Sequence, residues 1–304
     1  MAVMSIFITR IALAVAVLFF APLVLGLIKS LKAKLQNRRG PRLWQSYLDI
    51  IKLLKKDEVI SPTTSWVFRV APFGYLALAV AAAALLPLPL PGQQETYPDI
   101  FDVFLLMYVL AAGRFILVLA SLDAGSTFGG MGGSREMYVS VLVEPVLVLA
   151  FLTVAAPAGS TGLEAMARQA AQAPFSVPYV FAGFAFFILL LAETGRVPVD
   201  NPDTHLELTM IHEGMLLEYS GRRLGLIHLA AAVRQLIIIL LFVIFFIPWQ
   251  ASWGGILPQV ALKVVITAAA LAVTETCTNK MRLFRLPGFI AISGLLSLLA
   301  LVAQ

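Results

Sequence analysis

Residues 224–249 read LGLIHLAAAVRQLIIILLFVIFFIPW, and the only ionisable side chains among them are His228 and Arg234. An α-helix rises about 1.5 Å per residue, so roughly 20 residues of this kind cross a hydrocarbon core about 30 Å thick. The stretch therefore predicts a transmembrane helix with a charge inside it. Other apolar runs, bounded by proline, glycine or charged residues, predict spans near 5–28, 66–90, 99–122, 139–157, 177–194, 256–277 and 287–303. We expect an all-α polytopic membrane protein of about eight transmembrane helices, with residues 1–304 forming a single membrane domain.

The composition excludes several classes of protein. Apolar side chains make up 60% of the 304 residues and charged ones 13%, and the mean hydropathy is +0.91. Water cannot be the main solvent of such a chain. The single cysteine, Cys277, excludes an iron–sulfur or zinc thiolate cluster within the chain, and the three histidines lack the spacing of metal ligands. We therefore expect no metal and no cofactor in this chain.

The distribution of Lys and Arg predicts the orientation. The long connections 29–65, 123–138 and 195–223 carry most of the basic residues outside the spans, whereas the connections on the other side hold only Arg168. Because basic loops stay in the cytoplasm, the three long connections should form a cytoplasmic platform. Both termini should then lie on the non-cytoplasmic side of a cell (inner) membrane. The basic residues of the cytoplasmic loops thus explain the formal charge of +5, and we expect no nucleic acid partner.

Two parts of the platform show helical patterns. Apolar residues recur at three- and four-residue steps through 43–54, which predicts an amphipathic helix at the membrane surface, either a plain anchor or a functional element. Residues 204–219 also have helical spacing, after two prolines that prevent a continuous helix. This second segment is rich in acids, which form either a solvated face or the acidic mouth of a path: Asp200, Asp203, Glu207, Glu213 and Glu218.

Ionisable residues also fall inside the predicted spans: Arg114, Glu144, Glu193, Arg234, Lys263 and Glu275. A charge at the membrane centre costs roughly 2.5 to 3.5 kcal/mol, so these groups must pair, reach water or lose their charge. Their positions within the spans place the glutamates in the cytoplasmic half and the arginines deeper, with Lys263 nearer the opposite face. We expect a proton or ion path, with a pair between Arg114 and Glu144 as a hypothesis. Helix–helix pairing without further function is the alternative.

Several segments together resemble one family of membrane proteins. They read RRGP at 38–41, DIIKLL at 49–54, SLDAGS at 121–126, GSRE at 133–136, EP at 144–145, ETGRVPVD at 193–200 and EYSG at 218–221. In this order they are similar to the eight-helix membrane subunit shared by respiratory complex I and the membrane-bound energy-converting nickel–iron hydrogenases. The segments at 122–126 and 134–136 resemble the formate hydrogenlyase branch more than the quinone-reducing branch.

This resemblance implies a membrane anchor and coupling subunit, which links a cytoplasmic redox module to the translocation of protons or sodium ions. The implied partners are hydrogenase large and small subunits, an iron–sulfur protein and antiporter-like membrane subunits. These partners would carry the iron–sulfur clusters and the nickel–iron site, and this chain would hold no catalytic residue. Glu144 and Glu193 match the span glutamates with which the family's charge axis begins. The residues that match its acidic loop are Asp200, Asp203, Glu207 and Glu218.

The predicted site residues fall into two groups. The residues expected in coupling or along the proton path are Arg114, Glu144, Glu193, Asp200, Asp203, Glu207, Glu213, Glu218, Arg234, Lys263 and Glu275. The residues expected to dock partner subunits are Arg38, Arg39, Asp49, Lys52, Asp123, Arg135 and Glu136.

Two other functions are alternatives. The first is the complex I subunit itself, at whose platform a quinone is reduced; residues 210–214 depart from the spacing of that branch. The second is a stand-alone secondary transporter, against which counts the lack of an evident internal repeat. The sequence leaves open whether formate, carbon monoxide or ferredoxin is the electron donor, and whether protons or sodium ions are moved.

Overall fold

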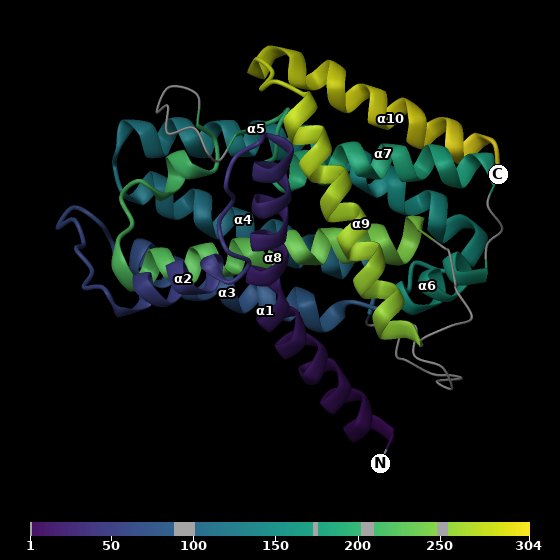
Figure 1. Cartoon of the computed structure of the whole chain (residues 1–304), viewed down its shortest axis with the longest axis horizontal. Coiled ribbons are helices and arrows are strands. Elements are labelled where there is room, and N and C mark those ends of the chain that lie inside the picture. Colours follow the sequence, from purple (N-terminus) through teal and green to yellow (C-terminus); the bar gives the residue numbers. More distant parts are fainter. Residues whose placement is uncertain (1, 88–100, 173–175, 202–209, 248–254) are drawn as a thin grey trace.

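The computed structural model describes residues 2–87, 101–172, 176–201, 210–247 and 255–304, and these residues are almost entirely helical (Figure 1). The helices are α1 (Ala2–Leu35), α2 (Gln45–Lys55), α3 (Trp66–Leu85), α4 (Val103–Asp123), α5 (Thr127–Ala158), α6 (Leu163–Gln172), α7 (Val177–Glu193), α8 (Gly221–Phe246), α9 (Ile256–Cys277) and α10 (Leu286–Val302), with 3₁₀ turns η1 (Glu213–Leu216) and η2 (Leu283–Arg285). Within these ranges the β-type pairing is limited to an isolated bridge between Asp102 and Gly162.

Helix α8 forms the centre of the bundle. It packs against α1, α2, α3, α6, α7 and α9, and in Figure 1 it runs horizontally through the middle while α1 and α9 cross it steeply. In the most apolar 18-residue stretch of α8, 72% of the residues are buried. The corresponding share is 28% in α9 and 28% in α10. Helices α9 and α10 therefore lie at the periphery, where their exposed apolar faces suit a lipid solvent.

The predicted transmembrane architecture is confirmed. Seven helices in the described part of the chain are long and apolar enough to cross a membrane, and α7 is a shorter apolar helix of 17 residues. Each predicted span overlaps one of these helices. The chain is thus a multi-pass, all-α membrane protein.

The platform contains less loop than expected, because residues 127–138 belong to α5. Ser126 caps this helix, since its hydroxyl accepts a hydrogen bond from the backbone N–H of Gly129 at 3.1 Å. Glycines at 129, 130, 132 and 133 weaken the local helical signal. Tertiary packing overrides that weakness: a Cβ added at Gly132 would lie 2.9 Å from the carbonyl oxygen of Ile211, so glycine permits the close approach of the segment before η1.

The amphipathic helix predicted within 43–54 is present as α2. Ile50 is buried, whereas Trp44, Leu48 and Ile51 are exposed, as expected for a helix that lies between protein and lipid. Helix α2 packs on α1 and α8.

The helix predicted for 204–219 is wrong in its described part. Residues 210–219 contain the short 3₁₀ turn η1 and no α-helix, and residues 204–209 lie outside the described residues. Tyr219 fastens the end of this segment to α3: its ring stacks on Phe68 with centroids 4.0 Å apart, and its hydroxyl donates to the carbonyl oxygen of Phe68 at 3.0 Å. Burial raises the pKa of the Tyr219 phenol above its usual range, so it remains a neutral donor.

Helix α6 lies in a connection for which we predicted no structure. Its buried face consists of Leu163, Met166, Ala167 and Ala170. Glu164, on the same helix, forms an ion pair with Arg10 of α1. Burial raises the pKa of the Glu164 carboxyl, and the charge of Arg10 opposes that change. The connection is therefore anchored to the bundle by both packing and charge.

We expect Gly132→Ala to destabilise the protein by about 1 to 3 kcal/mol, the usual cost of overpacking. The added Cβ would lie 2.9 Å from the Ile211 carbonyl oxygen and 3.0 Å from the backbone nitrogen of Met215, so η1 must move. Thermal unfolding of the purified protein measures the effect. Gly130→Ala is the control, because a Cβ there meets open space on the same helix. Equal stability of the two variants would contradict the packing argument.

Candidate functional site

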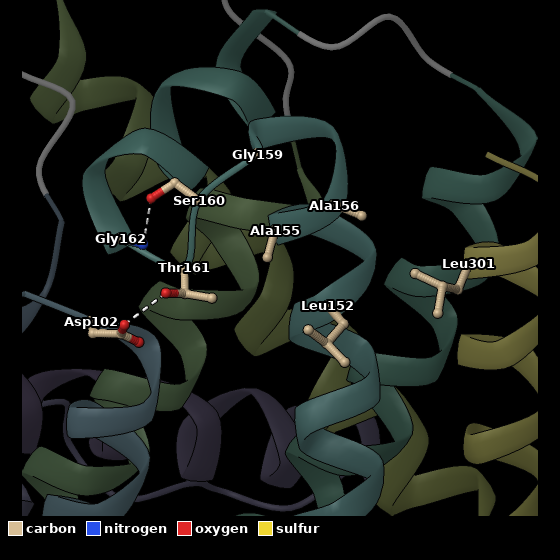
Figure 2. Close-up of a pocket in the computed structure, with 9 residues that line it drawn as sticks. All are labelled: Asp102, Leu152, Ala155, Ala156, Gly159, Ser160, Thr161, Gly162 and Leu301. Atoms are coloured by element: carbon tan, nitrogen blue, oxygen red, sulfur yellow. Dashed lines mark hydrogen bonds between the residues drawn. The ribbon is translucent and has the colours of Figure 1, made fainter. Parts of the chain in front are cut away.

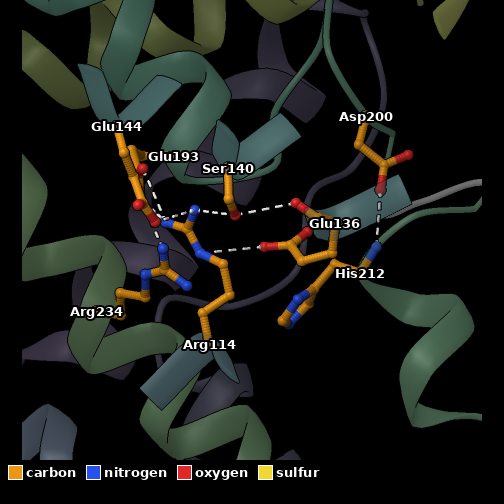
Figure 3. Close-up of polar contacts among 8 residues, drawn as sticks. All are labelled: Arg114, Glu136, Ser140, Glu144, Glu193, Asp200, His212 and Arg234. Carbon is orange, nitrogen blue, oxygen red and sulfur yellow. Dashed lines mark hydrogen bonds and ion pairs between the residues drawn. The ribbon is translucent and has the colours of Figure 1, made fainter. Parts of the chain in front are cut away.

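A buried ion cluster lies where α4, α5, α7 and α8 meet (Figure 3). Glu193, the last residue of α7, is at its centre. The Glu193 carboxylate accepts hydrogen bonds from Nη2 of Arg114 at 2.6 and 2.8 Å and from Nη2 of Arg234 at 2.6 Å. The three side chains are only 3% (Glu193), 6% (Arg114) and 8% (Arg234) exposed. Charges from three predicted spans are thus paired away from solvent.

Helix α5 contributes the other partners of Arg114. Nη1 of Arg114 donates to the Ser140 hydroxyl and lies 3.4 Å from Oε1 of Glu144, while its Nε lies 3.6 Å from Oε1 of Glu136. The hypothetical Arg114–Glu144 contact is present, but Glu193 binds Arg114 at shorter range. Glu136, which we expected to dock a partner, lies inside this ion cluster instead, because four-residue steps place it on the face of α5 that carries Glu144. We call the following residues the Glu193 cluster: Arg114, Glu136, Ser140, Glu144, Glu193 and Arg234.

The Glu193 cluster has a net negative formal charge. Three carboxylates and two guanidinium groups give three negative and two positive charges, hence a formal charge of −1. Buried carboxylates that share cations bind a proton or release it when the neighbouring charge changes. One added proton would make the cluster neutral.

A second buried ion cluster joins α9 to α1 and α8. Oε1 of Glu275 lies 2.7 Å from Nη1 of Arg196, and its Oε2 lies 3.0 Å from Nζ of Lys32. Nη2 of Arg196 also donates to Oε1 of Gln235 at 3.0 Å. The Glu275 side chain is 0% exposed. Glu275 was predicted as a buried charge, and we refer to it with its three partners as the Glu275 cluster.

A cavity of about 200 Å³ connects the two clusters. Nε of Arg234 and Nε2 of Gln235 are buried and have no hydrogen-bond partner among the described residues. Water takes about 30 Å³ per molecule, so this polar cavity has room for several waters that could bind these donors. Its ionisable lining comes from both clusters, from the platform, and from α3 and α8: Lys29, Lys32, Tyr75, Glu136, Glu193, Arg196, Asp200, His212, Glu213, His228 and Arg234.

Asp200 lines the polar cavity and holds the platform segments together. It is 3% exposed, and its Oδ1 lies 2.7 Å from Nζ of Lys280. Its Oδ2 accepts hydrogen bonds from the backbone N–H groups of Ile211 at 3.2 Å and His212 at 3.3 Å. Asp200 therefore links the segment after α7 to η1 and to the connection between α9 and α10.

The remaining residues predicted for coupling belong to neither ion cluster. Glu213 lines the polar cavity, whereas Glu218 is exposed. Lys263 donates to the carbonyl oxygen of Ile247 at 2.7 Å, apart from both clusters. Two predicted residues lie outside the described part of the chain: Asp203 and Glu207.

The residues predicted to dock partners fall into two groups, those bonded within the fold and those exposed on the surface. Asp123 accepts hydrogen bonds from the backbone N–H groups of Ser65 at 2.9 Å and Phe68 at 3.1 Å, and thus caps α3. Arg135 donates to the carbonyl oxygen of Met210 at 2.9 Å. These two side chains have roles within the fold. Those exposed on the surface, where a partner could reach them, are Arg38, Arg39, Asp49 and Lys52.

Glu144 borders a separate cavity of about 430 Å³ on the outer side of α4 and α5, which we call the lateral cavity. The Glu144 side chain is 42% exposed, although it lies near the middle of α5. The lateral cavity is also lined by Arg114 and Glu193. The Glu193 cluster therefore reaches the lateral surface of the bundle.

Figure 2 shows a third cavity, of about 620 Å³, beside the start of α4 and the end of α5. Asp102 supplies its carboxylate, which caps α4 by accepting from the Phe104 N–H at 2.8 Å and also accepts from the Thr161 hydroxyl at 2.7 Å. Asp102 precedes Arg114 by about 18 Å along the helix, so this cavity is far from the Glu193 cluster. Its acid stabilises a helix end.

Some members of the clusters were missed in the sequence. Lys32 and Arg196 were counted as basic loop residues that set the topology, and their burial beside Glu275 depends on helix order. Gln235 had a visible signal: it follows Arg234 within an otherwise apolar span. No group of three or more His, Cys, Asp or Glu side chains suited to a metal ion occurs among the described residues.

The fold and the two clusters together define a polytopic membrane protein with a chain of buried ion pairs. The sequence profile of the NADH dehydrogenase family matches residues 8–303. Formate hydrogenlyase subunit 4 of Escherichia coli (strain K12) is 34% identical over 272 residues, which cover 88% of this chain and 87% of the relative. Hydrogenase-4 component C of the same organism is 34% identical over 267 residues, which cover 84% and 80%.

The chain therefore belongs to the NADH dehydrogenase family, the family of complex I subunit 1, as its motifs predicted. A solved structure of the membrane-bound sulfane sulfur reductase, an archaeal respiratory membrane complex, contains a chain with the same fold. The TM-score is 0.80 at 19% identity, and the match covers 97% of this chain and 99% of that chain. The protein is a membrane subunit of the complex I-like and hydrogenase type.

Proposed function

We propose that this chain is the membrane anchor and coupling subunit of an energy-converting hydrogenase complex. In such a complex a cytoplasmic redox module drives the translocation of protons or sodium ions. The Glu193 cluster carries the proposal, because it lies between the polar cavity at the platform and the lateral cavity beside Glu144. The two Escherichia coli relatives support the hydrogenase branch of the family.

The proposed coupling uses charge. A redox event beside the platform changes the potential at Asp200 and Glu213, which line the polar cavity. That change alters the affinity of the Glu193 cluster for a proton, since its charges are buried and interact strongly. Glu144, on the outer side of the cluster, passes the change to a neighbouring membrane subunit. The expected partners are hydrogenase large and small subunits, an iron–sulfur protein and antiporter-like membrane subunits.

Glu144→Gln tests this proposal in the native complex. We expect ion translocation per hydrogen molecule to fall at least about tenfold in membrane vesicles, because the amide no longer changes charge. Hydrogen evolution and assembly should persist, since Glu144 is partly exposed and its contact with Arg114 is long, at 3.4 Å.

Glu144→Asp is the matched control, which keeps the carboxylate and should retain most of the translocation. Wild-type translocation in the Gln variant would remove Glu144 from the path. The same preparation should evolve hydrogen, and inhibitor-sensitive quinone reduction in place of hydrogen chemistry would contradict the hydrogenase branch.

A further inference from the structure

Two imidazoles, on His212 and His228, line the polar cavity from different elements. His212 lies just before η1, and the hydrogen bond from its backbone N–H to Asp200 fixes its position. His212 and Glu136 both line this cavity. His228 lies on α8, fewer than two turns before Arg234. Neither histidine belongs to the ion clusters, and neither was among the predicted site residues.

The charges around His228 make its protonation depend on the platform. Burial of His228 is the strongest influence and opposes its protonation; Glu213 of η1 and Asp49 of α2 favour the protonated form, and a protonated His212 and Lys29 of α1 oppose it. The other titratable or charged groups that face the same cavity are Lys32 of α1, Tyr75 of α3, Glu136 of α5, Glu193 of α7, Arg196 and Asp200 of the following segment, and Arg234 of α8. The two imidazoles thus share one cavity with the groups that lead to the Glu193 cluster.

We propose that His212 and His228 form a coupled proton-accepting pair that controls proton uptake by the Glu193 cluster. This inference rests on the coupling function proposed above and names its uptake groups. Two like charges within one cavity repel, so the pair binds a first proton much more readily than a second. Imidazole is also the side chain whose charge ordinarily changes near neutral pH, so a modest change in nearby charge loads or unloads it.

Proton uptake takes place in two transfers. A proton from the cytoplasmic side binds the free ring nitrogen of His212 and makes an imidazolium. Hydrogen-bonded water in the polar cavity then carries a proton to the carboxylate of Glu136, which becomes a carboxylic acid while His212 returns to the neutral imidazole. The formal charge of the Glu193 cluster changes from −1 to zero. A proton held on His228 opposes the reloading of His212, and it thereby sets the pH range over which uptake occurs.

The coupling between the imidazoles can be measured directly on the full chain in lipid nanodiscs. The chain contains three histidines, so NMR of ¹³C-labelled histidine gives three signals, which His→Gln variants assign. We expect the signals of His212 and His228 to show two titration steps separated by about one pH unit or more. In His212→Gln the signal of His228 should show one simple step at higher pH. Independent single steps in the wild type would overturn the inference.

A second measurement uses the native complex and separates the two proposals. Wild-type vesicles should show a ratio of ions moved per hydrogen molecule that changes with pH between about 6 and 8. His212→Gln should lower this ratio about tenfold and flatten its pH profile, whereas a merely structural role would leave the profile unchanged. A wild-type complex that moves no ions would contradict the coupling function, while the NMR titration would still decide whether the pair is coupled. A wild-type pH profile in His212→Gln would contradict the role of the pair.

Discussion

Glu193→Gln is expected to destabilise the protein by about 3 to 5 kcal/mol and to abolish ion translocation. Glu193 neutralises the guanidinium groups of Arg114 and Arg234, both at 2.6 Å, with its own side chain only 3% exposed. The amide leaves these two buried cations side by side. Arg114 then retains its hydrogen bond to the Ser140 hydroxyl and the longer contacts to Glu136, at 3.6 Å, and Glu144, at 3.4 Å.

Thermal unfolding of the purified complex measures the loss, which should lower the midpoint on the order of 10 °C. Glu144→Gln is the matched control on the same arginine, and its partly exposed carboxylate should cost less than about 1 kcal/mol. The double variant Glu193→Gln with Arg234→Gln removes one charge of each sign and should recover part of the stability. A Glu193→Gln protein as stable as the wild type would show that the cluster does not depend on this carboxylate.

Glu275→Gln should have a comparable effect on stability and a distinct local consequence. Its carboxylate, 0% exposed, binds Arg196 at 2.7 Å and Lys32 at 3.0 Å. Loss of that charge weakens the attachment of the segment 194–201 to α1 and α9. We expect a loss of about 3 to 5 kcal/mol and faster hydrogen–deuterium exchange in this segment.

Lys263→Gln is the control for this second prediction, because Lys263 lies on the same helix but binds a backbone carbonyl, that of Ile247, at 2.7 Å. It should leave the exchange of 194–201 unchanged. If both α9 variants altered exchange in that segment equally, the Glu275 cluster would not be what holds it.

The transmembrane architecture could be predicted from the sequence because it follows from local properties. A run of apolar residues as long as the membrane is thick specifies a span, whatever its neighbours are. The step of the apolar positions in 43–54 likewise specified α2. The motif at 193–200 indicated the family, and the buried charges at 114, 144, 193, 234 and 275 were visible as ionisable residues in apolar runs.

Local signals also failed in identifiable places. The glycines at 129, 130, 132 and 133 weaken the helical signal at the start of α5, so this start was not predicted. At Gly132 the missing side chain permits the close contact with Ile211. Helix α6 is short, and burial against the bundle stabilises it more than its own sequence does. We assigned Glu136 to the platform from the sequence. Because α5 begins at Thr127, Glu136 instead lies on this helix beside Arg114.

The sequence by itself determined that charges must be buried in this protein, since it placed ionisable residues in runs that only lipid or protein can surround. Only the tertiary structure decided which charges pair. Arg114 and Glu193 are separated by 79 positions in the chain, as are Arg196 and Glu275. Contacts of that range depend on the order and tilt of the helices, which the packing of the whole bundle sets. The same packing brings the Glu193 cluster, the Glu275 cluster and the two imidazoles to one cavity.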